Sequence, residues 1–143
     1  MQFNSLIIIS NRVTSFEDLA NRAAAGEVSG KIVVYNVPWQ GSYGGTVTYR
    51  TRGAIEAARY GAVASLTRSI TPFSLYTPHT GVMYYDSQYP EIPAAAITPE
   101  DADLIGYFYK NGYAPVLTLS LGCQTLAPSV SRNGSFFSFI CEK

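Results

Sequence analysis

Histidine and cysteine, the residues that most often hold zinc in proteins, are scarce in this sequence. The 143 residues include one histidine, His79, and two cysteines. Zinc needs three or four ligands at close range, and no cluster of Cys, His and Asp with metal-ligand spacing accompanies His79. We therefore expect no metal site and no cofactor in this chain, and we do not expect the chain alone to be an enzyme.

The two cysteines are both close to the C-terminal end of the sequence. Cys123 and Cys141 both lie near its end, outside the periodic part of the sequence. Their position excludes a fold that depends on several disulfides. It leaves open whether the two cysteines pair with each other and in which redox compartment the protein works.

Long apolar runs and a signal peptide are missing as well. No segment approaches the roughly 18 apolar residues that span a bilayer, so we expect no membrane partner. The start of the sequence lacks a basic region, and the apolar run Leu6–Ile9 is too short for the core of a signal peptide. This run instead predicts a short buried strand.

Charged residues are few and balanced. They make up 14% of the chain, with ten basic and ten acidic residues, whereas soluble domains usually carry about 25%. No segment concentrates Lys or Arg as binding to a phosphate backbone requires, so we expect no nucleic-acid partner. Two explanations of the apolar composition stay open: a well-filled core, or a surface that normally faces another domain.

The order of strand and helix patterns predicts an α/β fold. Apolar and β-branched runs predict strands over 32–35, 62–66, 92–97 and 116–121. Helical spacing follows between them, and the chain length suits one domain. We expect a compact domain with a mixed sheet or an open β-sandwich, flanked by about three helices.

Capping patterns mark where the predicted helices begin. Thr14 is the expected cap of the first helix, and Thr98 precedes Pro99 as the expected cap of the last. The middle helix is predicted to begin at Thr46, after a flexible glycine-rich loop over Pro38–Gly45. These boundaries place three helices between or after the predicted strands.

Five pieces of the sequence carry a resemblance to a known family. They are GKIVVYN at 30–36, TVTYRTRGAIEAARYGA at 46–62, SLTRSITPFSLYTPHTG at 65–81, IPAAAITPEDADLI at 92–105 and LGCQTLAPSVSRN at 121–133. Together they resemble the protease-associated (PA) domain of the carboxypeptidase Q family of zinc metallopeptidases. The motif TPHTG, with the RTRGAIEAA helix before it, is typical of that family rather than of PA domains in general.

The resemblance implies that residues 1–133 are a PA domain attached to a zinc metallocarboxypeptidase or dipeptidase domain that lies beyond it. The PA domain would be non-catalytic, would shape or cover the substrate cleft, and would support domain or dimer contacts. Its implied partners are that peptidase domain, a second copy and the peptide substrate, and its implied location is secreted or lysosomal. Zinc would belong to the parent enzyme.

The end of the sequence departs from the family pattern. Residues 134–143 are rich in Phe and Ser, and we expect them to be an atypical tail that replaces the start of the missing peptidase domain. A second function also stays open. The chain could be a free-standing protein-interaction module with no attached peptidase.

Three residues near one predicted strand end are candidates for substrate contact. Arg68 follows the strand 62–66, where α/β sheets expose functional loops, and arginine binds a carboxylate through two hydrogen bonds. The alternative for Arg68 is a solvated side chain. His79 and Tyr76 lie in the loop that follows, and His79 is otherwise a structural or interface histidine.

Aromatic residues gathered in two loops are candidates for an interface. They are Trp39, Tyr43, Tyr84 and Tyr85. Tyrosine is common at interfaces because it combines contact area with a polar tip, although ordinary packing within the loops is the alternative. The acidic residues Glu100, Asp101 and Asp103 are better explained as cap and dipole partners of a helix than as catalytic acids.

Overall fold

A five-stranded sheet forms the centre of the domain. The computed structural model describes residues 6–9, 13–122 and 127–130. The strands are β1 Leu6–Ile9, β2 Ile32–Tyr35, β3 Ala64–Arg68, β4 Ala94–Ile97 and β5 Val116–Leu117. Their order across the sheet is β4-β3-β2-β1-β5, with β1 to β4 parallel and β5 antiparallel to β1. The predicted mixed sheet is confirmed.

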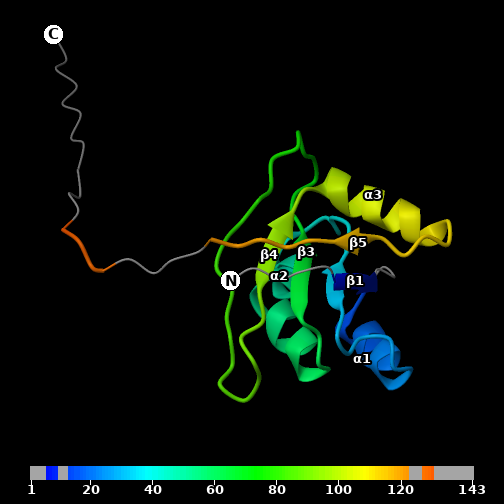
Figure 1. The fold of residues 1–143 in the computed structure, drawn as a ribbon. Coiled ribbons are helices and arrows are strands. Elements are labelled where there is room, and N and C mark those ends of the chain that lie inside the picture. Colours follow the sequence, from blue (N-terminus) through cyan, green and yellow to red (C-terminus); the bar gives the residue numbers. More distant parts are fainter. Residues whose placement is uncertain (1–5, 10–12, 123–126, 131–143) are drawn as a thin grey trace, which may run out of the picture.

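Three helices cover the sheet on its two faces (Figure 1). They are α1 Phe16–Ala24, α2 Tyr43–Arg59 and α3 Pro99–Lys110. Helices α1 and α2 share one apolar cluster with one side of β2, and α3 shares another with the opposite side. Strand β2 is therefore buried along its whole length, as expected for a central parallel strand. No helix in the described ranges is both long and apolar enough to cross a bilayer.

Small residues let α2 lie close to the sheet. Gly53, Ala54 and Ala57 are at helical spacing and face the Tyr35 ring and its neighbours. Tyr35 is fully buried, and its hydroxyl donates a hydrogen bond to the Gly53 carbonyl at 2.9 Å. Burial, and to a smaller degree the charge of Glu56, raises the pKa of Tyr35 well above its usual value, so the hydroxyl stays a donor.

The first helix begins one residue later than its sequence predicts. Ser15, rather than Thr14, is the cap, because the Asp18 backbone N–H donates to Ser15 Oγ at 3.0 Å. The Asp18 carboxylate in turn accepts from the Thr14 backbone N–H at 3.0 Å. Asp18 therefore takes part in both bonds at this helix start, and its carboxylate reaches the residue before the cap. The prediction that Thr14 is the cap was wrong.

The second helix begins at Tyr43, before the predicted Thr46. Ser42 caps it and accepts from the Gly45 backbone N–H at 3.3 Å. Gly44 and Gly45 therefore lie in the first helical turn, and the predicted loop extends too far. A serine cap offsets the low helix propensity of the two glycines.

The strand boundaries also move. Residues 62 and 63 belong to the turn after α2, where Gly61 has a φ of 77° and Ala62 bonds back to the Ala57 carbonyl. At its other end β3 extends two residues beyond the predicted strand, so Arg68 is the last residue of β3 instead of following it. The last predicted strand is shortened to Val116–Leu117.

Candidate functional site

A long connection between β3 and β4 carries several of the predicted site residues. It spans residues 69–93 and is fastened to the sheet at Ser69, whose hydroxyl donates to the Ile97 carbonyl at 2.7 Å. The same oxygen accepts from the His79 backbone N–H at 2.9 Å. Farther along, the Tyr84 N–H donates to the Thr51 carbonyl at 3.0 Å. The connection therefore lies along α2 and the carboxyl end of β3.

Arg68 holds helix α3 to the sheet. Its guanidinium forms an ion pair with Asp103, in which Nη2 donates to Oδ2 at 3.2 Å. Nη1 also donates to Asn36 Oδ1 at 3.0 Å and to the Pro99 carbonyl at 3.3 Å. The Arg68 side chain is 14% exposed, so it is not the solvated arginine considered above. Substrate contact by Arg68 stays a prediction.

Asn36 completes this attachment, and sequence reasoning missed it. The Asn36 amide donates to the Ala102 carbonyl at 2.7 Å, while its oxygen accepts from Arg68. Asn36 is buried directly after β2. A polar residue at the carboxyl end of a central strand, beside another strand that ends in arginine, was the signal available in the sequence.

The structure brings together two residues that were predicted for different roles. His79 was a candidate for substrate contact and Tyr43 for an interface, and their rings meet edge to face at 5.9 Å between centroids. Arg50 lies over the Tyr43 ring at 5.6 Å and donates to its hydroxyl at 2.6 Å. Sequence reasoning missed Arg50, although it shares the helical spacing of Gly53 and Ala54 and so belongs to the buried face of α2.

Tyr76 forms part of an exposed apolar tip of the connection. It has a φ of 56°, in the left-handed region, and its backbone N–H donates to Glu100 Oε1 at 3.3 Å. Phe73, Leu75 and Tyr76 are each more than 70% exposed. The carboxylate of Glu100 thus supports a backbone conformation that is unfavourable for tyrosine. The Ser74 hydroxyl is the main cause that lowers the pKa of Glu100.

The lowered pKa of Glu100 predicts a pH-dependent contribution to stability. Because the folded state favours the carboxylate, the contribution is present above the unfolded-state pKa of about 4.3 and is lost as the pH falls through the lower folded-state pKa. We expect Glu100→Gln to lower the urea midpoint at neutral pH, with the difference from the parent shrinking in acid. Glu91→Gln, at an exposed site of the same connection, is the control, and a pH-independent difference would contradict the prediction.

The four aromatic interface candidates lie at different depths. Trp39 is half-buried, whereas Tyr43, Tyr84 and Tyr85 are exposed. The Tyr85 hydroxyl donates to the Ile92 carbonyl at 3.0 Å and so closes the far end of the connection. Their use in an interface stays a prediction.

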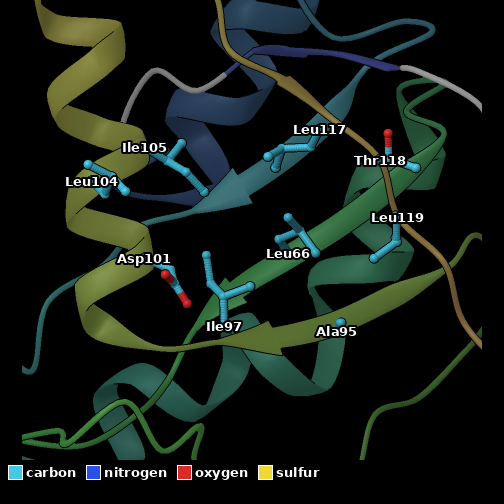
Figure 2. A pocket seen from close by; sticks show the side chains of 9 residues that line it. All are labelled: Leu66, Ala95, Ile97, Asp101, Leu104, Ile105, Leu117, Thr118 and Leu119. Atoms are coloured by element: carbon cyan, nitrogen blue, oxygen red, sulfur yellow. The ribbon is translucent and has the colours of Figure 1, made fainter.

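An open apolar cleft lies on the other face of the sheet. Figure 2 shows the residues of α3, β3, β4 and the β5 region that line this space. Its volume is about 320 Å³, and its lining residues are Leu66, Ala95, Ile97, Asp101, Leu104, Ile105, Leu117, Thr118 and Leu119. Asp101 is its one charged lining residue, and it is engaged by the Thr98 hydroxyl at 2.8 Å in the predicted cap of α3. The cleft is therefore a hydrophobic surface rather than a polar reaction centre.

The known proteins that this chain matches in sequence and in structure are all named as peptidases. No family model matches the chain. Carboxypeptidase Q from Homo sapiens is 48% identical over 121 residues, and the protein of that name from Xenopus laevis is 51% identical over 121 residues. The match covers 85% of this chain and 25% of each relative. A crystal structure of a peptidase M28 precursor from Shewanella amazonensis matches with a TM-score of 0.75 and 38% identity.

The chain is a carboxypeptidase Q-like segment of the peptidase M28 family. The structural match covers 82% of this chain and 27% of the M28 precursor. The chain thus spans about a quarter of the length of the relatives it matches. The family resemblance predicted from the five sequence pieces is confirmed.

The described part of this M28 segment does not fit a zinc site. Within it, no three or more His, Cys, Asp or Glu side chains come together as a metal ion requires. Its acidic side chains have other contacts: Asp18 binds Arg22 at 2.9 Å, and Glu56 binds Arg52 at 3.1 Å. Cys123, Cys141 and the predicted tail lie outside the described residues.

Proposed function

We propose that this segment is the non-catalytic protease-associated domain of a carboxypeptidase Q-like zinc peptidase. In that protein it would shape or cover the substrate cleft and dock on the peptidase domain. The observation that carries the proposal is the continuous match, at 48% identity over 121 residues, with one quarter of a carboxypeptidase Q. The zinc ions of such a peptidase would lie outside the residues described above.

The polar contacts of the domain support a structural rather than catalytic use of its acids. The Asp101 carboxylate accepts a hydrogen bond from Thr98, the cap of α3, and Asp103 pairs with Arg68. Glu100 contacts the backbone of Tyr76. Each of these acids has a role within the fold, so none is placed as a free general acid or base.

Two apolar surfaces support a docking role. One is the cleft of Figure 2, to which α3 contributes Leu104 and Ile105, and the same helix also exposes Tyr107 and Phe108. The other is the tip formed by Phe73, Leu75 and Tyr76. Exposed apolar groups of this kind often mark contact with another protein surface. A peptidase domain of the same protein is our proposed partner, with a secreted or lysosomal location implied by the family resemblance.

An exchange of domains tests the proposal. The 121-residue stretch of human carboxypeptidase Q that matches this chain is replaced by the corresponding residues of this chain. We expect the chimera to bind zinc like its parent and to hydrolyse peptides with kcat/KM reduced by less than about tenfold. A chimera that is folded and zinc-loaded, yet inactive, would contradict the proposal and favour a free-standing interaction module.

Substitutions in the chimera test whether the connection 69–93 contacts the substrate. Changing His79 and Tyr76 to alanine should raise KM more than it lowers kcat if the connection 69–93 lies over the bound peptide. Arg52→Ala is the matched control because its ion pair with Glu56 lies on the exposed side of α2. Equal kinetics of the two variants would remove both residues as substrate contacts.

A further inference from the structure

Arg50 is a buried cation without a counter-charge in the described part of the chain. It is 7% exposed, and it lies on the inner face of α2. The ion pairs found among the described residues do not include it. A buried charge is costly unless it is paired and hydrogen-bonded. A bound anion would therefore lower the free-energy cost of burying the Arg50 charge.

One nitrogen of Arg50 also lacks a hydrogen bond. Nε donates to the Val82 carbonyl at 3.4 Å, and Nη2 donates to the Tyr43 hydroxyl at 2.6 Å. Nη1 is buried and has no partner among the described residues. Native proteins leave few buried donors unsatisfied, and each exception calls for an explanation such as a bound ligand.

Arg50 lines a cavity with a distinct chemical character. The cavity has a volume of about 250 Å³ and is bounded by Ala94, Ala96 and Met83, which supply apolar groups, and by Thr67 and Thr80. The Thr67 hydroxyl already donates to the Tyr49 carbonyl at 3.3 Å. Thr80 is exposed and its hydroxyl can donate to a ligand.

We propose that this cavity binds a small apolar carboxylate, such as the C-terminal residue of a peptide. The carboxylate would accept hydrogen bonds from Arg50 Nη1 and the Thr80 hydroxyl, and the apolar side chain would lie against Ala94 and Ala96. Arg50 is the one cationic residue that lines the cavity, and one guanidinium matches a single negative charge better than a phosphate dianion. Only the choice of a peptide as the source of the carboxylate rests on the proposed function.

Binding at this site is linked to the connection 69–93. The backbone of Gly81 packs so tightly on the guanidinium that a Cβ atom there would lie 2.7 Å from Arg50 Cζ. Nη1 itself is covered, so a carboxylate reaches it only with a local rearrangement, and Gly81 contacts the same guanidinium through Cζ, Nη2 and Nε. The backbone amides of residues 80–83 should therefore report binding.

The test is a titration of the full 143-residue chain, followed by the amide signals in nuclear magnetic resonance spectra. The probes are N-acetylalanine, its uncharged amide and inorganic phosphate. We expect saturable shifts at residues 80–83 and 94–96, with N-acetylalanine binding at least about tenfold more tightly than the amide, a difference expected for a charge-assisted contact. Absence of binding, equal affinity for the amide, or equal affinity for phosphate would overturn the proposal.

Variants separate the site from general effects of charge. Arg50→Met should abolish the preference for the acid, whereas Arg52→Met, on the exposed side of the same helix, should leave it unchanged. If Arg50→Met fails to fold, Ala96→Leu, which fills the cavity while keeping the guanidinium, decides the question. Unchanged binding in Ala96→Leu would overturn the proposal. These measurements need no peptidase activity, so their failure is distinguishable from failure of the domain exchange.

Discussion

Gly53→Ala should destabilise the domain by about 1–2 kcal/mol, although alanine is the better helix former. An added Cβ at this position would lie 2.7 Å from Cε2 of Tyr35. The Tyr35 ring is fully buried and its hydroxyl is bonded to the Gly53 carbonyl, so the ring cannot yield easily. Overpacking is thus expected to exceed the gain in helix propensity. Urea unfolding followed by circular dichroism measures the change.

Gly44→Ala is the matched control in the same helix. A Cβ at Gly44 meets no atom within 4 Å, so this substitution should stabilise the domain by up to about 1 kcal/mol through helix propensity alone. The two alanine variants should therefore change stability in opposite directions. Stabilisation by both would show that Tyr35 does not lie against Gly53 as described.

Arg68→Met should cost about 1–3 kcal/mol of folding free energy because it leaves partners of a hydrogen-bonded arginine unsatisfied. The buried Asn36 oxygen and the Pro99 carbonyl would each lose a donor. The exposed Arg52→Met should change stability by less than about 1 kcal/mol, as usual for a surface ion pair. Chemical unfolding of both variants provides the comparison.

A double-mutant cycle with Asp103 tests the same attachment more directly. Asp103 is 66% exposed, so removing it alone should cost less than removing Arg68. If the two side chains interact as described, the double variant should be more stable than the sum of the single losses implies. Additive losses would contradict direct coupling, and an unaltered stability of Arg68→Met would leave the arginine available for substrate.

The sequence predicts most of the secondary structure because the apolar periodicity is strong. Strand β2 is an uninterrupted apolar run, and α3 begins with the favourable combination of Thr98 and Pro99. The errors lie at helix starts and at strand ends. At Thr14 and Ser15 two adjacent hydroxyl residues offer alternative caps, and the position of Asp18 decides between them only in three dimensions.

The site was less predictable than the fold because its contacts join distant parts of the chain. Arg68 was predicted to be important, but Asn36 and Asp103 became its partners only through the order of strands and the placement of α3. Arg50 and His79 meet around Tyr43 because the connection 69–93 folds back along α2. No local sequence pattern encodes such a return.

The pairing of β1 with β5 bears on how such a segment could be carried within a longer protein. Leu6 at the start of β1 lies opposite Leu117 at the end of β5, so the polypeptide enters and leaves the sheet at neighbouring points. A domain whose two ends lie close together can be inserted into another protein, because the residues before and after the insertion remain neighbours in space. This geometry would allow a carboxypeptidase Q-like protein to carry the segment as an insertion while its host fold remains continuous.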